Sequence, residues 1–581
     1  MSNRTIKIMV IDLDNEEAEV LDRPDLSTYI GGVALGLQLL KEHGFPEEEA
    51  LNPQQPIIYT KGPLNTVFPV VTKTCSLFKS PLTGELGESY VGMRFSMAMG
   101  MAGLDGLVIK GKANRPIILK INNHSLEIKE GHSLWGLNTD ETTRLLHDQP
   151  GRRGLRSILV IGEAGEKNIN FACVTVDTYR HFGRLGLGAV MGSKGIKGII
   201  VEGDQSQIID NPKKYNKVYE EIYHRVNETD LMEKYHGVGT SININALNDI
   251  KALPTHNFKD NCFEFANEIS GETFAKDHLI KKVACSGCTI GCIHIALLRQ
   301  KYGDSHEYQS STIAYDHELI YSLGSMLGVG NPEELMVLIE TVELMGLDAM
   351  TTGVLLAWIT EAYEKGYITE KETIEKPQFG NAKAYHEMIK LIVKQPNLFY
   401  KQAAKGTHYL AEKYGGKDFA MVLGKNEVAG YHTGYGNLIG QAVGGRHSHL
   451  DNAGYSFDQE KGNIGNEELV KKLIQEEIDR NLLNSLVICL FARKIYDYPT
   501  VIAGLEAIGQ KVSLEDLKKL ATKTFIEKIA LKEKMGFSYD EIHFPKRFFE
   551  TMGGRNKLNA EEAHLILDLY KEEIKKIRHQ N

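Results

Sequence analysis

Short apolar runs, broken by Gly, Pro and Asn, dominate the first ~205 residues of the chain. Runs of this kind, bounded by turn residues, are typical of β-strands. The sequence Asn122-Asn123-His124 predicts a hairpin between two of them. The first domain is therefore expected to be β-rich, and its predicted strands are residues 7–12, 56–60, 106–110, 117–121, 157–161 and 198–202.

The pattern changes after Asp210-Asn211-Pro212, where apolar residues begin to recur with the helical period. The predicted helices are residues 213–227, 332–345, 354–365, 382–394, 466–494, 514–535 and 560–576. We place one boundary near residues 205–212 and another near residues 405–425. The predicted fold class is α+β, with a β-rich domain over residues 1–208 and two mostly α-helical domains over residues 209–415 and 416–581.

The composition is that of an ordinary globular protein, with 581 residues, 42% hydrophobic and 25% charged. A chain of this length buries a large core and needs no metal merely to fold. The formal net charge is -9 and no basic face is evident, so we expect no nucleic-acid partner. No apolar run is long enough for a membrane span, and the first residues do not form a secretory signal. These features predict a cytoplasmic protein.

Three of the seven cysteines lie close together, in the pattern Cys285-x2-Cys288-x3-Cys292. Small residues between them allow the backbone to curl so that three thiolates converge, and thiolates are the ligands of iron–sulfur clusters. The fourth ligand then has to be a distant cysteine in an ordered element. Cys489, in an apolar run, fits this best, so the sequence predicts a cluster held by these four residues.

Other uses of the cysteines fit the spacing less well. Zinc sites usually need a second closely spaced pair, and a thioredoxin-like site does not need a third cysteine. Radical enzymes that use S-adenosylmethionine have the reverse spacing. The remaining cysteines, Cys75, Cys173 and Cys262, stand alone and are predicted to be buried small apolar residues.

Two glycine-rich segments, residues 79–92 and 183–194, also stand out in the first domain. Glycine lets backbone N–H groups approach a phosphate closely, and Arg or Lys neutralises its charge. Turns in a β-rich domain explain such segments equally well. Neither segment matches a Walker A loop or a dinucleotide-binding fingerprint.

Taken together, these segments resemble the tungsten-containing aldehyde ferredoxin oxidoreductase family from end to end. The matching pieces are residues 62–64, 79–84, 103–113, 134–136, 161–166, 183–194, 285–292, 346–348, 362–366 and 544–548. The resemblance implies tungsten held by two pterin dithiolenes beside one [4Fe–4S] cluster. It also implies oxidation of an aldehyde to a carboxylic acid, with electrons leaving to ferredoxin or a ferredoxin-like subunit, in a homo- or hetero-oligomer.

The resemblance also implies which residues bind the pterin. Arg184 corresponds to the pterin-binding arginine, and Asp348 to the first acidic recognition residue. The residues implied to bring backbone or side-chain groups to the cofactor are Gly92, Leu185, Gly186, Leu187, Thr352, Gly353, Asn484 and Ile488.

The chain departs from the family pattern at four positions. Lys73 replaces an arginine between cluster and pterin and loses its bidentate fork. Tyr90 replaces an asparagine, which puts a family magnesium site in doubt. Asn484 replaces the second acidic residue, and Val487 replaces a glycine. We interpret the chain as a divergent member. An iron–sulfur electron-transfer or scaffold protein with a decayed pterin site, and a carboxylic acid reductase using the same site, remain alternatives.

Aldehyde oxidation needs a group that moves a proton. A buried glutamate with a raised pKa would suit this task. Glu318 is the first candidate and Glu307 the second. His449 is preferred over His447 because it aligns with the family's Gly-Gly-x-His-Leu.

Overall fold

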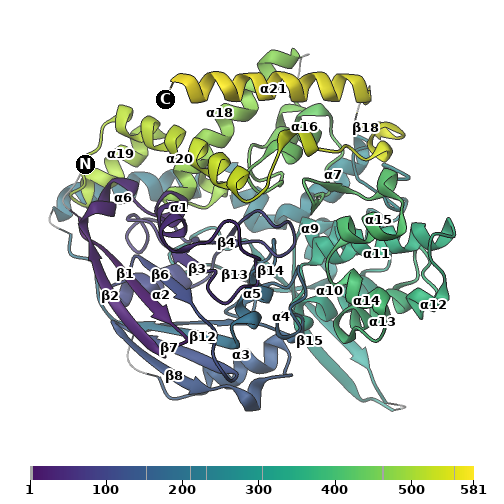
Figure 1. Ribbon diagram of the computed structural model, residues 1–581, viewed down its shortest axis with the longest axis horizontal. Helices are drawn as coiled ribbons and strands as arrows, with labels where there is room; N and C mark the ends of the chain where they lie inside the picture. The colour runs from purple at the N-terminus through teal and green to yellow at the C-terminus, as the bar shows by residue number, and fades with distance from the viewer. Residues whose placement is uncertain are drawn as a thin grey trace. The chain divides into compact units, whose positions relative to one another are not determined.

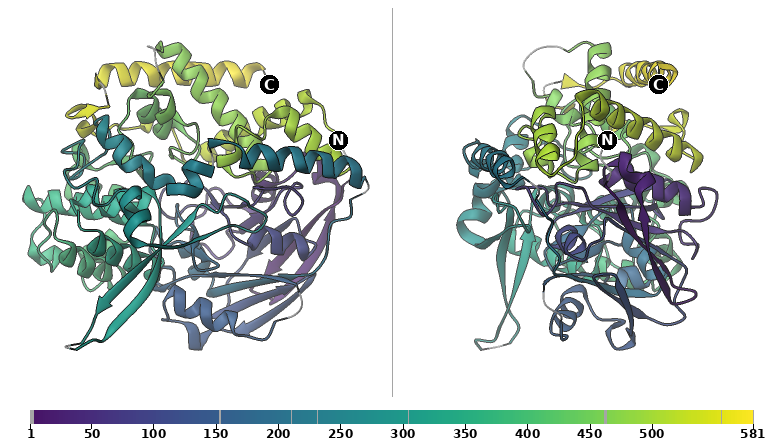
Figure 2. Two further views of the ribbon diagram at one scale, coloured as in Figure 1. Left: turned by 180° about the vertical axis from the view of Figure 1, so that it is seen from behind. Right: turned by 90° about the vertical axis from the view of Figure 1, so that its left-hand side faces the viewer.

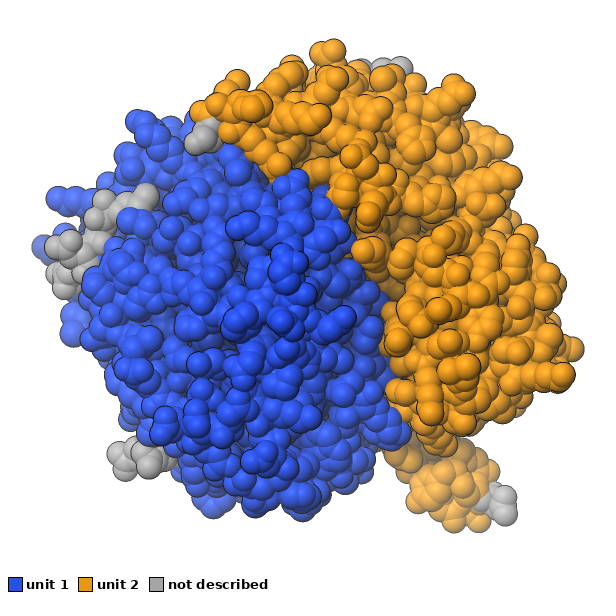
Figure 3. Space-filling view, in the orientation of Figure 1, with its two compact units in different colours: residues 1–232, 284–291, 477–537 blue, residues 233–283, 292–476, 538–581 orange. Residues whose placement is uncertain are grey.

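The computed structural model describes residues 4–151, 154–209, 211–230, 232–303, 305–460, 464–554 and 556–580, so that Asp210 lies outside the described residues. The chain forms two compact units (Figure 3). Unit 1 comprises residues 1–232, 284–291 and 477–537, and unit 2 comprises residues 233–283, 292–476 and 538–581. The chain therefore passes repeatedly from one unit to the other. The three predicted domains, with boundaries at residues 208 and 415, stay a prediction.

Unit 1 contains two six-stranded sheets (Figure 1). The first has the order β2-β1-β6-β3-β4-β5, and the second has the order β11-β10-β9-β12-β7-β8. All six predicted strands are present, and so is the predicted hairpin, in which Asn122 pairs with Ser125. The strands are β1 (Ile6–Asp12), β2 (Glu17–Arg23), β3 (Ile57–Thr60), β4 (Thr74–Lys79), β5 (Leu86–Val91), β6 (Gly106–Lys110), β7 (Ile117–Asn122), β8 (Ser125–Glu130), β9 (Leu155–Val160), β10 (Val174–Val176), β11 (Arg180–Phe182) and β12 (Ile196–Gly203).

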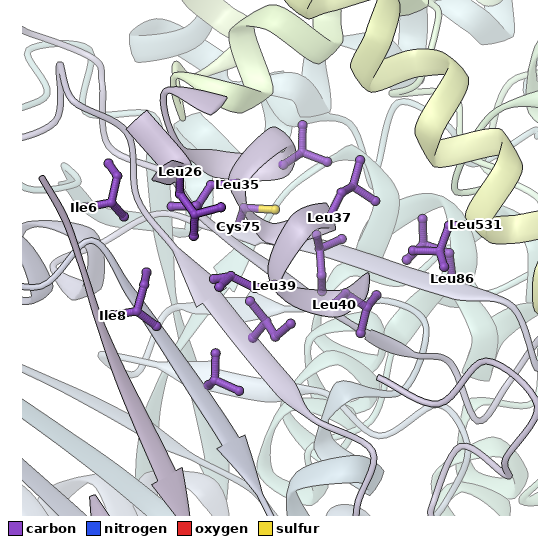
Figure 4. Close-up of a cluster of buried hydrophobic side chains, with 14 of the residues drawn as sticks. Ile6, Ile8, Leu26, Leu35, Leu37, Leu39, Leu40, Cys75, Leu86 and Leu531 are labelled. Carbon is purple, nitrogen blue, oxygen red and sulfur yellow. The ribbon is translucent and has the colours of Figure 1, made fainter. Parts of the chain in front are cut away.

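An apolar core lies between the first sheet and helix α1 (Gly32–His43) (Figure 4). Cys75 belongs to this core and is fully buried, and Cys173 is also buried, as predicted. The prediction is wrong for Cys262, which is exposed. Its thiol approaches the carbonyl oxygen of Asn248 at 3.7 Å instead of packing among apolar side chains.

The α+β fold class is confirmed, because long helices follow the β-rich segment. Helices α11 and α18 differ most from their predicted bounds. Helix α11 starts before residue 354 because Asp348 caps it, and α18 ends before residue 494 because Val487 has a left-handed φ of 54°. The longer helices are α6 (Pro212–Asn227), α10 (Pro332–Met345), α11 (Ala349–Glu364), α13 (Ala382–Lys394), α18 (Asn466–Ser485), α20 (Leu514–Lys534) and α21 (Ala560–Gln580).

Unit 2 contains a three-stranded sheet that the sequence pattern did not predict. Its strands are β13 (Leu279–Val283), β14 (Ile293–Lys301) and β15 (Tyr308–Tyr315), in that order. Strands β14 and β15 form a long hairpin (Figure 2) whose polar outer part hid the strand signal. Among the described residues, no helix is long and apolar enough to cross a membrane.

A buried ion pair in unit 1 ties α20 to β5. Lys528 Nζ lies 2.8 Å from Glu88 Oε2, and the two side chains are 2% and 0% exposed. Tyr90 donates its hydroxyl to the other carboxylate oxygen of Glu88 at 2.7 Å.

We expect Lys528→Met to destabilise unit 1 by about 3–5 kcal/mol, because it leaves the buried Glu88 carboxylate without this cation. Urea unfolding followed by circular dichroism measures the change. Lys519→Met is the control, since Lys519 pairs with Glu515 on the exposed face of the same helix. Equal unfolding midpoints for the two variants would show that the Lys528–Glu88 ion pair does not stabilise unit 1.

Candidate functional site

The cysteine loop, residues 284–292, closes the hairpin between β13 and β14, since Val283 pairs with Ile293. Positive φ values at Gly287 and Gly291, 75° and 60°, curl the loop in the way the sequence suggested. Within the loop, the backbone N–H of Cys288 donates to the carbonyl of Cys285 at 3.0 Å. Among the described residues, none of the four predicted cysteine ligands forms a disulfide.

A segment of unit 1 that we call the strap, residues 67–73, binds both cysteine-bearing segments of that unit. Val70 N donates to the carbonyl of Gly287 at 3.0 Å, and Val70 O accepts from Cys489 N at 3.1 Å. Lys73 N donates to the carbonyl of Val487 at 3.1 Å. The strap therefore places the backbone of Cys489 next to the loop that carries Cys285 and Cys288. Cys292, the last residue of the loop, begins the next segment of unit 2.

Two tyrosines hold the strap from the other side. Tyr215 donates its hydroxyl to Val67 O at 2.6 Å, and Tyr496 donates to Pro69 O at 2.5 Å. Burial raises the pKa of Tyr496 well above its usual range, so this hydroxyl stays a donor. Neither tyrosine belongs to a motif that sequence reasoning could have identified.

Gly92 borders the cysteine loop. A Cβ at this position would lie 2.5 Å from Cys285 Sγ and 3.6 Å from Lys73 Nζ. Glycine is therefore required beside the thiol, and the structure brings the cation of Lys73 to the same place. The backbone of the next residue, Met93, accepts from Ser286 N at 3.1 Å.

The donor chemistry of these residues fits an iron–sulfur cluster. Four soft thiols are available, and the missing side chain at Gly92 leaves room at one of them. Among the described residues, no three His, Cys, Asp or Glu side chains lie close enough to hold a single metal ion. A cluster of several irons spaces its thiolates more widely than one ion does, so this finding concerns mononuclear sites only.

The end of α18 packs tightly on glycines of unit 1. A Cβ at Gly32 would lie 2.1 Å from Asn484 O, and one at Gly62 would lie 2.5 Å from Leu486 O. Asn484 and Ile488 are both buried. Val487 keeps a left-handed φ that favours glycine, so the replacement of glycine by valine has not removed this backbone conformation.

The two glycine-rich segments meet at one hydrogen bond, in which Ser80 Oγ donates to Leu185 O at 2.8 Å. Leu185 and Gly186 have positive φ values of 69° and 85°, and a Cβ at Gly186 would lie 2.0 Å from Asn170 O. This turn places half-buried Arg184 three residues before the start of α5 (Leu187–Ser193). Tyr90, by contrast, directs its hydroxyl at Glu88, and the implied magnesium site stays a prediction.

Asp348 in unit 2 caps helix α11. Its carboxylate accepts from Met350 N at 3.0 Å and from Thr351 Oγ1 at 2.6 Å. Thr352 donates its hydroxyl to Asp348 O, and Gly353 allows close packing because its Cβ would lie 2.1 Å from Ser322 O. These contacts give the three predicted residues a role in helix capping and packing. Their role in pterin binding stays a prediction.

Glu318 and His449 lie together in unit 2, although they are far apart in the sequence. Glu318 is in the first turn of α9 (His317–Leu323), and His449 follows α16 (Tyr435–Val443). Glu318 Oε1 lies 3.2 Å from His449 Nε2, and the histidine side chain is 3% exposed. Nδ1 of His449 is buried and has no hydrogen-bond partner among the described residues.

The predicted rise in the pKa of Glu318 is wrong. Burial alone would raise this pKa, but the hydrogen bond from His449 and the charges of His317 and His449 lower it to about 2. The carboxylate is therefore ionised at neutral pH, and it can stabilise a proton on the imidazole of His449.

Aromatic side chains that the sequence did not single out surround this pair. The Tyr431 ring lies 4.9 Å from the His449 ring, and the Tyr455 ring lies 5.8 Å from it. Burial lowers the pKa of His317 to about 4, so this neighbour is neutral at physiological pH. Tyr431 is also neutral, because burial and the charge of Glu318 raise its pKa well above the usual range. The pair therefore lies in an uncharged aromatic environment.

The other two candidates, Glu307 and His447, make different contacts. Glu307 is exposed at the tip of the β14–β15 hairpin, where it accepts from Ser305 N at 3.2 Å. His447 is buried and places Nδ1 2.8 Å from Ala442 O, which holds the loop before His449.

Family profiles match almost the whole chain. The profile described as aldehyde ferredoxin oxidoreductase, N-terminal domain, matches residues 8–203, and the profile for domains 2 & 3 matches residues 217–574. The chain belongs to the aldehyde ferredoxin oxidoreductase family. It is thus an oxidoreductase of the aldehyde ferredoxin oxidoreductase type.

Relatives in this family span most of the chain. A tungsten-containing aldehyde ferredoxin oxidoreductase of Thermococcus kodakarensis is 31% identical over 544 residues, 90% of this chain and 87% of that relative. Another from Pyrococcus furiosus is 28% identical over 556 residues, 92% and 89% of the two chains. The active site complex BamBC of benzoyl coenzyme A reductase shares the fold, with a TM-score of 0.83 at 18% identity, over 98% of this chain and 94% of that chain.

We expect Gly92→Ala to displace Cys285 Sγ and to lower the iron content per chain, because the added Cβ would lie 2.5 Å from the sulfur. Iron analysis and visible absorbance measure this. Gly237→Ala is the matched control, since a Cβ there meets nothing within 4 Å. Equal iron content in the two variants would show that Cys285 does not bind the cluster.

Proposed function

We propose that this chain is a tungsten-dependent oxidoreductase that oxidises aldehydes to carboxylic acids. In this proposal, electrons leave through a [4Fe–4S] cluster held by Cys285, Cys288, Cys292 and Cys489, and pass to ferredoxin or a ferredoxin-like subunit. The observation that carries the proposal is the pair of half-buried Glu318 and buried His449, in a chain whose relatives are named tungsten-containing aldehyde ferredoxin oxidoreductases.

The cofactors would supply the redox chemistry, and the protein residues would bind and surround them. When bound, the tungsten pterin centre would supply the two-electron oxidation, and the cluster would supply a one-electron route. The turn Arg184–Leu187, the backbone at Gly92 and the amide of Asn484 would hold the pterin. Lys73 would place a positive charge beside the Cys285 thiolate.

The Glu318–His449 pair is suited to accept a proton. Oxidation of an aldehyde to an acid adds the oxygen of water, so a proton must leave the reacting group. With Nε2 of His449 directed at the Glu318 carboxylate, the other ring nitrogen, Nδ1, is the acceptor in the neutral imidazole. The carboxylate then orients the ring and stabilises the imidazolium that forms. The structure thus favours His449 as the base and Glu318 as its ionised partner.

An iron–sulfur electron-transfer or scaffold protein with a decayed pterin site is the second candidate. It is favoured by the departures at Lys73, Tyr90 and Asn484, and by the engagement of Asp348 in capping α11. Carboxylic acid reduction would use the same site in the opposite direction.

An assay of aldehyde oxidation separates the first two candidates. The enzyme is purified without oxygen from cells supplied with tungstate and is given benzyl viologen with short aliphatic and aromatic aldehydes. We expect the matching acid to form, with about two viologens reduced per acid, since the oxidation releases two electrons. Absence of acid from every aldehyde, in protein that contains both metals, would contradict the proposal.

We expect Glu318→Gln to lower turnover by roughly 10²–10⁴-fold with metals retained, the size of a lost acid–base contribution. Glu307→Gln, at the exposed hairpin tip, is the control and should leave turnover unchanged. Near-normal turnover in the Glu318 variant would refute the role of the pair.

A further inference from the structure

Asp177 is a buried carboxylate of unit 1 that lies outside every motif of the sequence. It follows β10, and its side chain is 2% exposed. Oδ1 accepts from Ile158 N at 3.0 Å, and Oδ2 accepts from Ser157 Oγ at 3.0 Å, so the carboxylate is joined to β9. Each carboxylate oxygen can accept a second hydrogen bond. Oδ2 can therefore also hold a segment outside the sheet.

That segment is the turn before α2 (Phe95–Met101). Arg94 N donates to Asp177 Oδ2 at 3.0 Å, and Arg94 Nε lies 3.5 Å from the same oxygen. The preceding residue, Met93, has a left-handed φ of 69°. This conformation is unfavourable for a residue with a Cβ and persists only where surrounding contacts hold it. The hydrogen bond from Arg94 N to Asp177 is one of these contacts.

The same turn contacts the cysteine loop. Met93 O accepts from Ser286 N at 3.1 Å, and a Cβ at Gly92 would lie 2.5 Å from Cys285 Sγ. Residues 92–94 therefore connect the Asp177 carboxylate to a predicted cluster ligand through one short run of backbone. All of these residues belong to unit 1. A shift of this turn would move the backbone that borders the sulfur of Cys285.

Capping of α2 does not account for this carboxylate. A capping side chain normally belongs to the N-cap residue itself and accepts from the N–H groups of the first helical turn. Asp177 lies 83 residues from Arg94 and accepts from the N–H of the N-cap residue, the position directly after Met93. The contact thus holds the turn between β5 and α2.

We propose that Asp177 is a positioning residue for the iron–sulfur cluster, which fixes the backbone of residues 92–94 and thereby the place of Cys285 Sγ. This inference rests on the proposed function, in which Cys285 binds the cluster. A residue that orients a metal ligand through hydrogen bonds tunes the metal centre without touching it. Loss of this carboxylate is therefore expected to change the spectrum of the cluster and the rate at which it loses iron.

Electron paramagnetic resonance of the dithionite-reduced enzyme tests the proposal without turnover. Asp177→Asn keeps the shape of the side chain, but its amide group has one acceptor oxygen and cannot accept from both Ile158 N and Arg94 N. We expect shifted g values of the cluster. We also expect iron release to a chelator roughly 10–100-fold faster than from the wild type, the usual cost of losing such a partner of a metal ligand.

Two controls separate this role from charge and from general stability. Arg94→Gln removes a guanidinium group whose side chain is 41% exposed and keeps the backbone N–H, so we expect the wild-type signal. Asp458→Asn alters a carboxylate of unit 2 that also accepts from two backbone N–H groups and one hydroxyl, those of Gly436, Asn437 and Thr433. It should lower the unfolding midpoint in urea and leave the cluster signal unchanged.

A rescue variant tests whether the backbone of Met93 carries the effect. Glycine adopts a left-handed φ without support. In the Asp177→Asn, Met93→Gly double variant, we therefore expect the g values and the rate of iron release to return toward those of the wild type. No recovery would overturn the proposal, and this outcome stays decisive if the single variant does not fold.

An unchanged cluster signal in Asp177→Asn protein would overturn the positioning role alone. An equal change in Arg94→Gln or Asp458→Asn would also overturn it, because charge or general stability would then explain the effect. Absence of a cluster signal in the wild type would instead contradict the proposed function, so the two failures are distinguishable.

Discussion

The backbone hydrogen bonds of the strap, residues 67–73, are the constraint on which the predicted cluster site depends. They connect Val70 to both Gly287 and Cys489, segments that lie about two hundred residues apart in the chain. A cluster binds only where its sulfur ligands lie close together, and these hydrogen bonds hold two cysteine-bearing segments side by side. The buried hydroxyls of Tyr215 and Tyr496 hold the strap in turn. Val70 adopts a left-handed φ of 65°. This backbone conformation is unfavourable for valine and persists only because the surrounding contacts hold it.

Electrostatics, rather than burial alone, determines the chemistry of the acid–base pair. A buried carboxyl group without a partner would hold its proton more tightly. Here the contact with His449 outweighs that tendency, so Glu318 is an anion and the histidine has a fixed orientation. Neutral neighbours such as Tyr431 and His317 leave the pair as the local centre of charge. The arrangement favours proton transfer by the two residues acting together.

Local signals explain which features could be predicted from the sequence. Helices α10 and α13 have their predicted bounds because Asn331 and Asn381 cap them, and side-chain capping is encoded by neighbouring residues. Cysteine spacing and family motifs are also local in the sequence, so they indicated the candidate ligands. The β13–β15 sheet was missed because the outer part of its hairpin is polar. The early end of α18 and the low pKa of Glu318 were missed because they depend on contacts with residues distant in sequence. No local pattern reveals that Tyr215 hydrogen-bonds to Val67, or that Asp348 is occupied in capping a helix.

We expect this fold to hold a tungsten centre together with an iron–sulfur cluster. Metal analysis of the protein, purified without oxygen from cells supplied with tungstate, tests this expectation. We expect about one tungsten and about four irons per chain. Iron without tungsten or molybdenum would contradict it, and would identify the chain as an iron–sulfur protein whose pterin site has been lost.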